Sequence, residues 1–317
     1  MLYRLRQALL HHLPDKPAIM MEPVEPNKED CCNSGCNPCI FDVYEKQLLL
    51  YKRFLRGDKI VKPVRNAISQ LSYAKFSLTK SVKVSNVHKL LLFQQTLLDN
   101  NSEVHWNPGD HFLLKYTDDF NNCSRAFSPL KPSLCCDDKH EMENNDFAII
   151  VKKYDNGIVS NYLYNLIPND ITLWRGPYGS FEINLTLNCI IMIAQGTGIL
   201  PFISIIDKYL DNEDNLTKII LYYCCKNYDE ILFRDKLYAY KCYWNFTYKI
   251  FLNHHSPDDK PKYLEPIFNH KLRSTNLSEL LPLSGNDQFL ISGSTLFMSE
   301  YQQSIKTLCP VVNIKLF

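Results

Sequence analysis

Two patterns of hydrophobic and polar residues divide the chain. Between residues 64 and 132, short apolar runs such as Ala74–Leu78 and Val87–Phe93 alternate with polar turns. A period of two residues is typical of strands that bury one face, and the close spacing of the runs predicts a small antiparallel β-barrel. A further strand of this barrel is expected over Phe147–Tyr154.

The second half of the chain follows a different pattern. Ile190–Ala194 is continuously apolar, and a glycine turn and an apolar helix that begins near Pro201 follow it. Continuous apolar strands that alternate with helices are typical of a parallel sheet covered on both faces. We therefore predict a two-domain protein, α+β followed by α/β. It has a leader and cysteine-rich module at 1–63, an antiparallel β-barrel domain at 64–182 and a doubly wound parallel-sheet domain at 183–317.

The glycine turn of the second domain has the chemistry of an anion site. Gly196 and Gly198 lack the Cβ atoms that would keep a pyrophosphate away from the backbone. Pro201 suits a first helical turn, where no backbone N–H is needed, and the free N–H groups of that turn face the anion. The motif predicts a dinucleotide site, although by itself it fits an ordinary strand-to-helix turn equally well.

A second anion site is predicted after the Phe147–Tyr154 strand. Gly157 permits a turn, and Ser160 is expected to cap the next helix with its hydroxyl, so that free N–H groups from Ser160 to Leu163 hold phosphate oxygens. An ordinary capped helix is the alternative. Farther along, Trp174–Phe181 is expected to form the tight turn that leaves the barrel.

The segment Arg125–Leu130 combines a permanent cation, an aromatic ring and a hydroxyl. Because alternate side chains of a strand share a face, Arg125, Phe127 and Pro129 are expected on one side. In this interpretation Arg125 grips a pyrophosphate, Phe127 lies along a flavin edge and Ser128 hydrogen-bonds the ring. Taken alone, the segment is also consistent with a plain strand.

Composition narrows the class of function. The chain has 35 Lys and Arg against 34 Asp and Glu, a net charge of +1, so nucleic-acid partners are not expected. No run reaches the roughly 18 apolar residues of a membrane-spanning helix, so no spanning segment is expected. The membrane association that the sequence leaves open is peripheral contact. Arg4 and Arg6 precede the first acid, Asp15. This start is interpreted as a mitochondrial presequence or as an amphipathic leader, so the expected location is intracellular, either cytoplasmic or mitochondrial.

Cysteine usage points to an intracellular redox environment and to one unusual turn. The chain holds 12 cysteines but no secretory signal, which predicts reduced thiols rather than disulfides. Four of them gather on a turn rich in Gly, Pro and Asn: Cys31, Cys32, Cys36 and Cys39. Soft thiolate ligands suit Zn²⁺ or an iron–sulfur cluster, so a metal site is predicted there. An unmetallated, interaction-forming turn is the alternative.

The order of the motifs resembles one family. RxFSPL from Arg125, GxVSxYL from Gly157, RGPYGSF from Arg175 and AQGTGILPF from Ala194 are followed by a DEILFR helix and a late ISGS turn. This set spans about residues 64 to 317 and resembles the ferredoxin-reductase-like flavoproteins, most closely the NADH–cytochrome b5 reductases. The cysteine-rich turn resembles the short oxidoreductase-like module that precedes some reductases.

The resemblance implies an FAD-binding six-stranded barrel and a nicotinamide-nucleotide domain. The implied FAD-binding residues are Arg125, Phe127, Ser128, Pro129, Gly157, Val159 and Ser160. The implied nicotinamide-nucleotide residues are Gly196, Thr197, Gly198, Pro201, Ser292, Gly293 and Phe297. Ser128, beside the flavin, and Ser292, beside the nicotinamide, are the two residues to which the resemblance assigns a direct part in catalysis. NADH is the expected donor, because Lys226 is the only cation near the end of the Ile219 strand; NADPH stays open.

The implied reaction takes hydride from NADH onto a flavin and passes electrons singly to an acceptor protein such as cytochrome b5. Three departures from the family pattern bear on it. Phe127 stands where tyrosine is usual, Gln195 where glycine is usual, and Ser292-Gly293-Ser294 where Cys-Gly-Pro is usual. The altered Gln195 and Ser292 turns, together with the cysteine-rich module, keep a second hypothesis open: a catalytically weakened flavoprotein that acts as an interaction or assembly factor.

Overall fold

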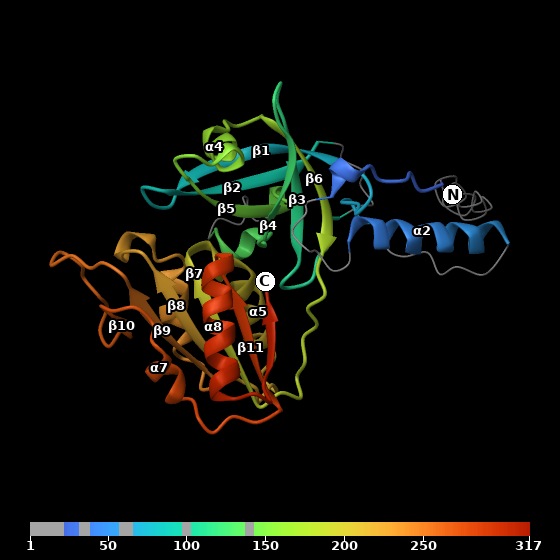
Figure 1. Ribbon diagram of the computed structural model, residues 1–317. Coiled ribbons are helices and arrows are strands. Elements are labelled where there is room, and N and C mark those ends of the chain that lie inside the picture. Colours follow the sequence, from blue (N-terminus) through green and yellow to red (C-terminus); the bar gives the residue numbers. More distant parts are fainter. Residues whose placement is uncertain (1–21, 32–38, 57–65, 97–102, 137–142) are drawn as a thin grey trace, which may run out of the picture.

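The computed structural model describes residues 22–31, 39–56, 66–96, 103–136 and 143–317 (Figure 1). Two sheets, one after the other along the chain, form its body. Within these ranges no helix combines the length and the apolar character needed to cross a membrane. The leader predicted at the start of the chain lies outside the described residues.

The first sheet is antiparallel and curled. Its strands are β1 Ala74–Lys83, β2 His88–Gln95, β3 His111–Thr117, β4 Asn122–Phe127, β5 Phe147–Lys152 and β6 Ile171–Tyr178. They are ordered β4-β3-β6-β1-β2-β5, and every neighbouring pair is antiparallel. An antiparallel bridge from Leu130, just after β4, to Ala148 in β5 joins the two ends of the sheet. The prediction of a six-stranded antiparallel barrel is confirmed.

Strand β2 shows why part of this barrel is apolar on both faces. Leu91 and Phe93 point into the barrel core, whereas Leu90 and Leu92 belong to a second apolar cluster that also includes Phe202 of the next domain. A strand covered on both sides loses the simple alternation of a half-exposed strand. One continuous core therefore joins the two domains.

The second sheet is parallel and covered on both faces. Its strands are β7 Cys189–Gln195, β8 Lys218–Cys225, β9 Phe246–Leu252, β10 Ile267–Phe268, β11 Asp287–Ser292 and β12 Asn313–Leu316. The order is β10-β9-β8-β7-β11-β12, with parallel pairs throughout. Helices α5 Leu200–Leu210 and α6 Arg234–Tyr240 pack on one face, and α7 Ser274–Ser278 and α8 Thr295–Leu308 on the other. The doubly wound prediction is confirmed.

The predicted tight turn over Trp174–Phe181 is wrong in its first half. Trp174 to Tyr178 complete β6, where Arg175 pairs with Leu113 and Tyr178 pairs with His111 across a register shift. Gly176 has φ +152, and a Cβ there would lie 2.8 Å from the Phe112 ring. The glycine therefore serves an irregularity inside the strand, and the chain leaves the barrel only after Tyr178.

The described N-terminal segment contacts the barrel through Asp30 and Val43. A short 3-10 helix, η1 Lys28–Asp30, precedes the helix α2 Ile40–Leu55. Val43 of α2 packs on Leu113 and Tyr178, and the buried guanidinium of Arg175 donates to the Asp30 carbonyl. Figure 1 shows the rest of α2, in blue, projecting away from the barrel.

Candidate functional site

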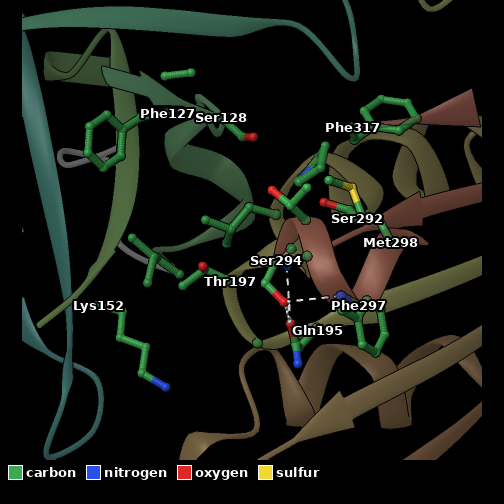
Figure 2. Close-up of a pocket in the computed structure, with 18 of the residues that line it drawn as sticks. Phe127, Ser128, Lys152, Gln195, Thr197, Ser292, Ser294, Phe297, Met298 and Phe317 are labelled. Atoms are coloured by element: carbon green, nitrogen blue, oxygen red, sulfur yellow. Dashed lines mark hydrogen bonds between the residues drawn. The ribbon is translucent and has the colours of Figure 1, made fainter. Parts of the chain in front are cut away.

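A cavity of about 1850 Å³ lies between the two sheets and is lined by turns from both (Figure 2). Pockets for single small ligands usually measure roughly 300 to 1,000 Å³, so this cavity has room for more than one. The sequence-predicted residues that line it are Arg125, Phe127, Ser128, Gly157, Val159, Ser160, Gly196, Thr197, Gly198, Pro201, Ser292, Gly293 and Phe297. Residues predicted from separate motifs are thus brought to one place.

The second domain contributes the carboxyl ends of two adjacent parallel strands, β7 and β11. From β7 the chain proceeds to β8 on one side, whereas β11 and β12 lie on the other side. Such a point of reversal leaves a crevice between the outgoing connections, and it is where ligands bind in open parallel sheets. The turn after Gln195 and the turn after Ser292 both open into this crevice.

The glycine turn after β7 has the shape that the anion-site prediction needs. Gly196 has φ +53, and an added Cβ would have nothing within 4 Å, so the backbone faces open space. At Gly198 an added Cβ would lie 2.6 Å from the Ser292 carbonyl oxygen. Gly196 therefore keeps room for a ligand, Gly198 allows the two turns to pack, and Pro201 lies in the first turn of α5, as predicted.

The barrel contributes the start of helix α4 Ile158–Asn165. Here the prediction that Ser160 caps the helix is wrong, because Gly157 is the N-cap and the Ser160 hydroxyl donates to the Gly157 carbonyl at 3.0 Å. The first N–H to find a helical acceptor belongs to Asn161. The N–H groups of Ile158, Val159 and Ser160 thus have no acceptor within the helix, and this first turn lines the cavity.

The end of strand β4 supplies the third wall. Phe127 packs edge-on against Trp174 with ring centroids 5.8 Å apart, which fixes its ring at the cavity margin. Arg125 is exposed and Ser128 is half-buried, and both line the cavity. Pro129 is buried and is not among the lining residues, so the structure does not bring it to the cavity with Arg125 and Phe127.

The turn after β11 lies partly behind the glycine turn. Ser292 is only 5% exposed, because Gly198 covers it. Phe297 is also largely buried, and its ring packs at a tilt against Tyr301 of the same helix, with the centroids 4.6 Å apart. These residues shape the back of the cavity more than its open surface.

Sequence reasoning missed an ion pair that joins the two domains at the cavity. Lys152 ends β5 of the barrel, and its Nζ lies 2.5 Å from Oε2 of Glu230 in η4 Tyr228–Glu230 of the second domain. The two side chains are 20% and 8% exposed. In the sequence, the ion pair could have been suspected only from a lysine that ends a fully apolar strand. Its partner could not be identified, because it lies 78 residues away.

Phe317 and Lys315 line another part of the cavity. Phe317 packs on Phe181 and Phe202 with centroid distances of 5.5 and 5.4 Å, and Lys315 donates to the Ser180 hydroxyl at 3.3 Å. Phe181 and Phe317 thus give this part of the cavity an aromatic wall.

Two other titratable groups that line the cavity are uncharged at neutral pH. Burial lowers the pKa of His111 to about 4, and burial raises the pKa of the Cys224 thiol to about 12. At neutral pH His111 is an uncharged imidazole and Cys224 a protonated thiol. The cavity therefore gains neither an imidazolium nor a thiolate nucleophile from these two residues, and its chemistry suits groups that a bound cofactor brings.

The predicted metal site is only partly described. Cys31 and Cys39 are placed as half-buried free thiols, whereas Cys32 and Cys36 lie outside the described residues. Among the residues that the structure does describe, no three His, Cys, Asp or Glu side chains form a group suited to a metal ion. Metal binding by the cysteine-rich turn stays a prediction.

Three family models match the chain. Residues 75–183 match the oxidoreductase FAD-binding domain, and residues 192–303 match the oxidoreductase NAD-binding domain. Residues 17–57 match the N-terminal domain of oxidoreductase-like proteins. The first two matches coincide with the two sheets, and together they supply the two cofactor-binding domains that open into the cavity.

Curated relatives match most of the chain. The mouse protein named NADH-cytochrome b5 reductase-like is 28% identical over 293 residues, which cover 88% of this chain and 89% of that protein. The human protein of the same name is 26% identical over 294 residues, covering 89% and 90%.

Solved structures share the fold. The cytochrome b5 reductase domain of nitrate reductase from Ulva prolifera superposes with a TM-score of 0.64 at 18% identity, covering 80% of this chain and 100% of that one. The CS-b5R domains of human Ncb5or, in an NAD⁺ form, give a TM-score of 0.64 at 20% identity, covering 77% and 69%.

Proposed function

Because the chain contains an oxidoreductase FAD-binding domain and an oxidoreductase NAD-binding domain, we propose that it transfers reducing equivalents from NADH through FAD to a one-electron acceptor of the cytochrome b5 type. The observation that carries the proposal is the single cavity into which both cofactor domains open. The names of the mouse and human relatives support the acceptor class.

On the barrel side, the chain offers groups that suit a flavin dinucleotide. The N–H groups at the start of α4 and the guanidinium of Arg125 provide positive charge for a pyrophosphate. Phe127, held against Trp174, offers an apolar face, and the Ser128 hydroxyl offers a hydrogen-bonding group beside it. When bound, the flavin supplies the conversion between two-electron and one-electron chemistry.

On the sheet side, the chain positions a second dinucleotide. The open turn at Gly196 would hold a pyrophosphate, and the turn after β11, with Ser292 buried beneath it, would support the nicotinamide end. Phe317 and Phe181 add an aromatic wall to the same cavity. Holding donor and acceptor in one cavity would turn their encounter into a step within a single complex.

The first test is an anaerobic absorbance spectrum of the purified full chain, reconstituted with FAD where needed, before and after addition of NADH and, separately, NADPH. We expect a flavin band that NADH bleaches, and haem reduction when oxidised cytochrome b5 is then added. An Arg125→Gln variant is expected to retain less FAD, whereas Lys131→Gln, exposed on the segment that follows, serves as the matched control.

Three results would contradict the proposal, each at a different level. A bound flavin that neither nucleotide bleaches would favour the hypothesis of a weakened flavoprotein that acts as an interaction or assembly factor. Failure to bind FAD after reconstitution would refute the assignment of Arg125 and the α4 start as a cofactor site. If NADH bleached the flavin but no electrons reached cytochrome b5, the transfer from NADH to FAD would stand and cytochrome b5 would be excluded as the acceptor.

A further inference from the structure

Two of the positions at which the sequence departs from the family pattern lie in contact. The Oε1 atom of Gln195 accepts hydrogen bonds from the backbone N–H of Ser294 at 3.1 Å and from the Ser294 hydroxyl at 2.9 Å (Figure 2). Gln195 ends β7, and Ser294 directly precedes α8. The interaction therefore ties together the two turns that border the nucleotide side of the cavity.

The chemistry of Ser294 fixes which end of the Gln195 carboxamide faces it. A backbone N–H only donates, so the carboxamide must present its oxygen. The Ser294 hydroxyl donates to the same oxygen and accepts from the Phe297 N–H at 3.4 Å, as the N-cap of α8. Each donor of Ser294 thus has an acceptor, and the start of α8 is linked to the end of β7.

The Gln195 side chain also fills the space over the second turn. A Cβ added to Gly293 would lie 2.8 Å from the Gln195 Cβ and 2.9 Å from the Phe297 ring. On the other side of the junction, Gly198 packs on the backbone of Ser292. The two turns are therefore held by close packing at one point and by the Gln195 carboxamide at another.

Each member of the pair depends on the other. Glycine at 195 would leave both donors of Ser294 without this acceptor and would uncover Gly293. Proline at 294 would remove the N–H and the hydroxyl together, because proline has no backbone donor. It would leave the Gln195 oxygen without either partner. A chain that carries glycine and proline at the two positions would have neither defect.

We propose that Gln195 is a positioning residue that acts with Ser294 as a single unit and sets the affinity of the cavity for the nicotinamide dinucleotide. This proposal rests on the proposed function, because the dinucleotide is the ligand that the two turns receive. By holding the turns in their ligand-ready arrangement before binding, the pair reduces the ordering that binding requires.

The test is a double-mutant cycle on the FAD-loaded chain with NAD⁺ as the probe, measured by titration calorimetry. Gln195→Gly and Ser294→Pro are expected to raise the Kd for NAD⁺ about tenfold each, the effect of roughly one to two lost hydrogen bonds. The combined variant is expected to lie within about threefold of the wild type, far below the product of the single effects. The melting temperature of the same proteins without nucleotide is expected to show the same non-additivity.

Two control variants guard against misfolding. Gln195→Met keeps the side-chain length but removes the hydrogen bonds, and it is expected to raise the Kd like the glycine variant; Gln303→Met, exposed on α8, is expected to leave it unchanged. Additive single effects, or an unchanged Kd in Gln195→Met, would overturn the proposal while the proposed function stands. If the wild-type chain bound FAD but no nicotinamide nucleotide, the proposed function and this inference would both fall.

Discussion

Replacement of Lys152 by methionine is expected to destabilise the protein through the contact between its two domains. The Lys152 ammonium lies 2.5 Å from the Glu230 carboxylate, and Glu230 is only 8% exposed. Methionine keeps most of the aliphatic length of lysine and removes the charge. The carboxylate of Glu230 would then stay in a poorly solvated position without its counter-ion.

The expected loss in the free energy of unfolding can be bounded by two known ranges for ion pairs. Exposed pairs contribute roughly 0.2 to 1 kcal/mol, whereas removal of one partner from a buried pair costs roughly 3 to 5 kcal/mol. Because Lys152 is 20% exposed, we expect the lower end of the second range, about 3 kcal/mol. For a chain of this size, that corresponds to a fall in the melting temperature of roughly 5 to 10 °C.

The assay is thermal unfolding of the full chain, followed by circular dichroism at low and at high salt. Lys153→Met is the matched control, since Lys153 is the exposed neighbour in the sequence. The combined variant Lys152→Met/Glu230→Gln should recover most of the lost stability, because it leaves no unpaired charge. Equal melting temperatures for the Lys152 and Lys153 variants would refute the reasoning, as would a loss that disappears in high salt.

Three further predictions concern stability. Burial, and then the charge of Lys152, lowers the pKa of His88 to about 4, so unfolding takes up a proton below pH 6.5 and stability falls as pH drops. Between pH 7.5 and pH 5.0, the free energy of unfolding from urea titrations should fall by about 2 kcal/mol less in His88→Gln than in the wild type. The exposed control His254→Gln should lose as much as the wild type. Gly198→Ala should lower the melting temperature more than Gly196→Ala, because only the former meets backbone at 2.6 Å; equal losses would contradict this. Arg175→Met should cost about 2 kcal/mol in urea unfolding and speed proteolysis of residues 22–31, because the Asp30 carbonyl loses its charged donor; unchanged proteolysis would argue against that anchor.

Strands and turns could be predicted from the sequence where the local pattern of apolar residues matches the burial in the structure. The apolar run Ile190–Ala194 and the glycines that follow it determine a buried strand and an open turn from neighbouring residues alone. Ser160 shows the limit of such reasoning. A serine after a glycine turn suits an N-cap, but the helix begins two residues earlier, at Ile158, and the hydroxyl bonds back to Gly157 instead. Helix starts depend on backbone geometry that a cap-like residue type does not determine.

Contacts between distant segments were beyond the reach of the sequence, and the interaction of Gln195 with Ser294 shows why this matters for function. The two residues lie 99 positions apart. In the sequence, each is therefore interpreted by itself, as an unfavourable departure from its own motif. Their contact arises only because β7 and β11 are adjacent and parallel, which brings Ala194 beside Ser292 and places the next turns together. In that setting the glutamine supplies the acceptor that the serine N–H and hydroxyl need. Two apparent losses are therefore one interaction, and their consequence for nucleotide binding has to be judged on the pair.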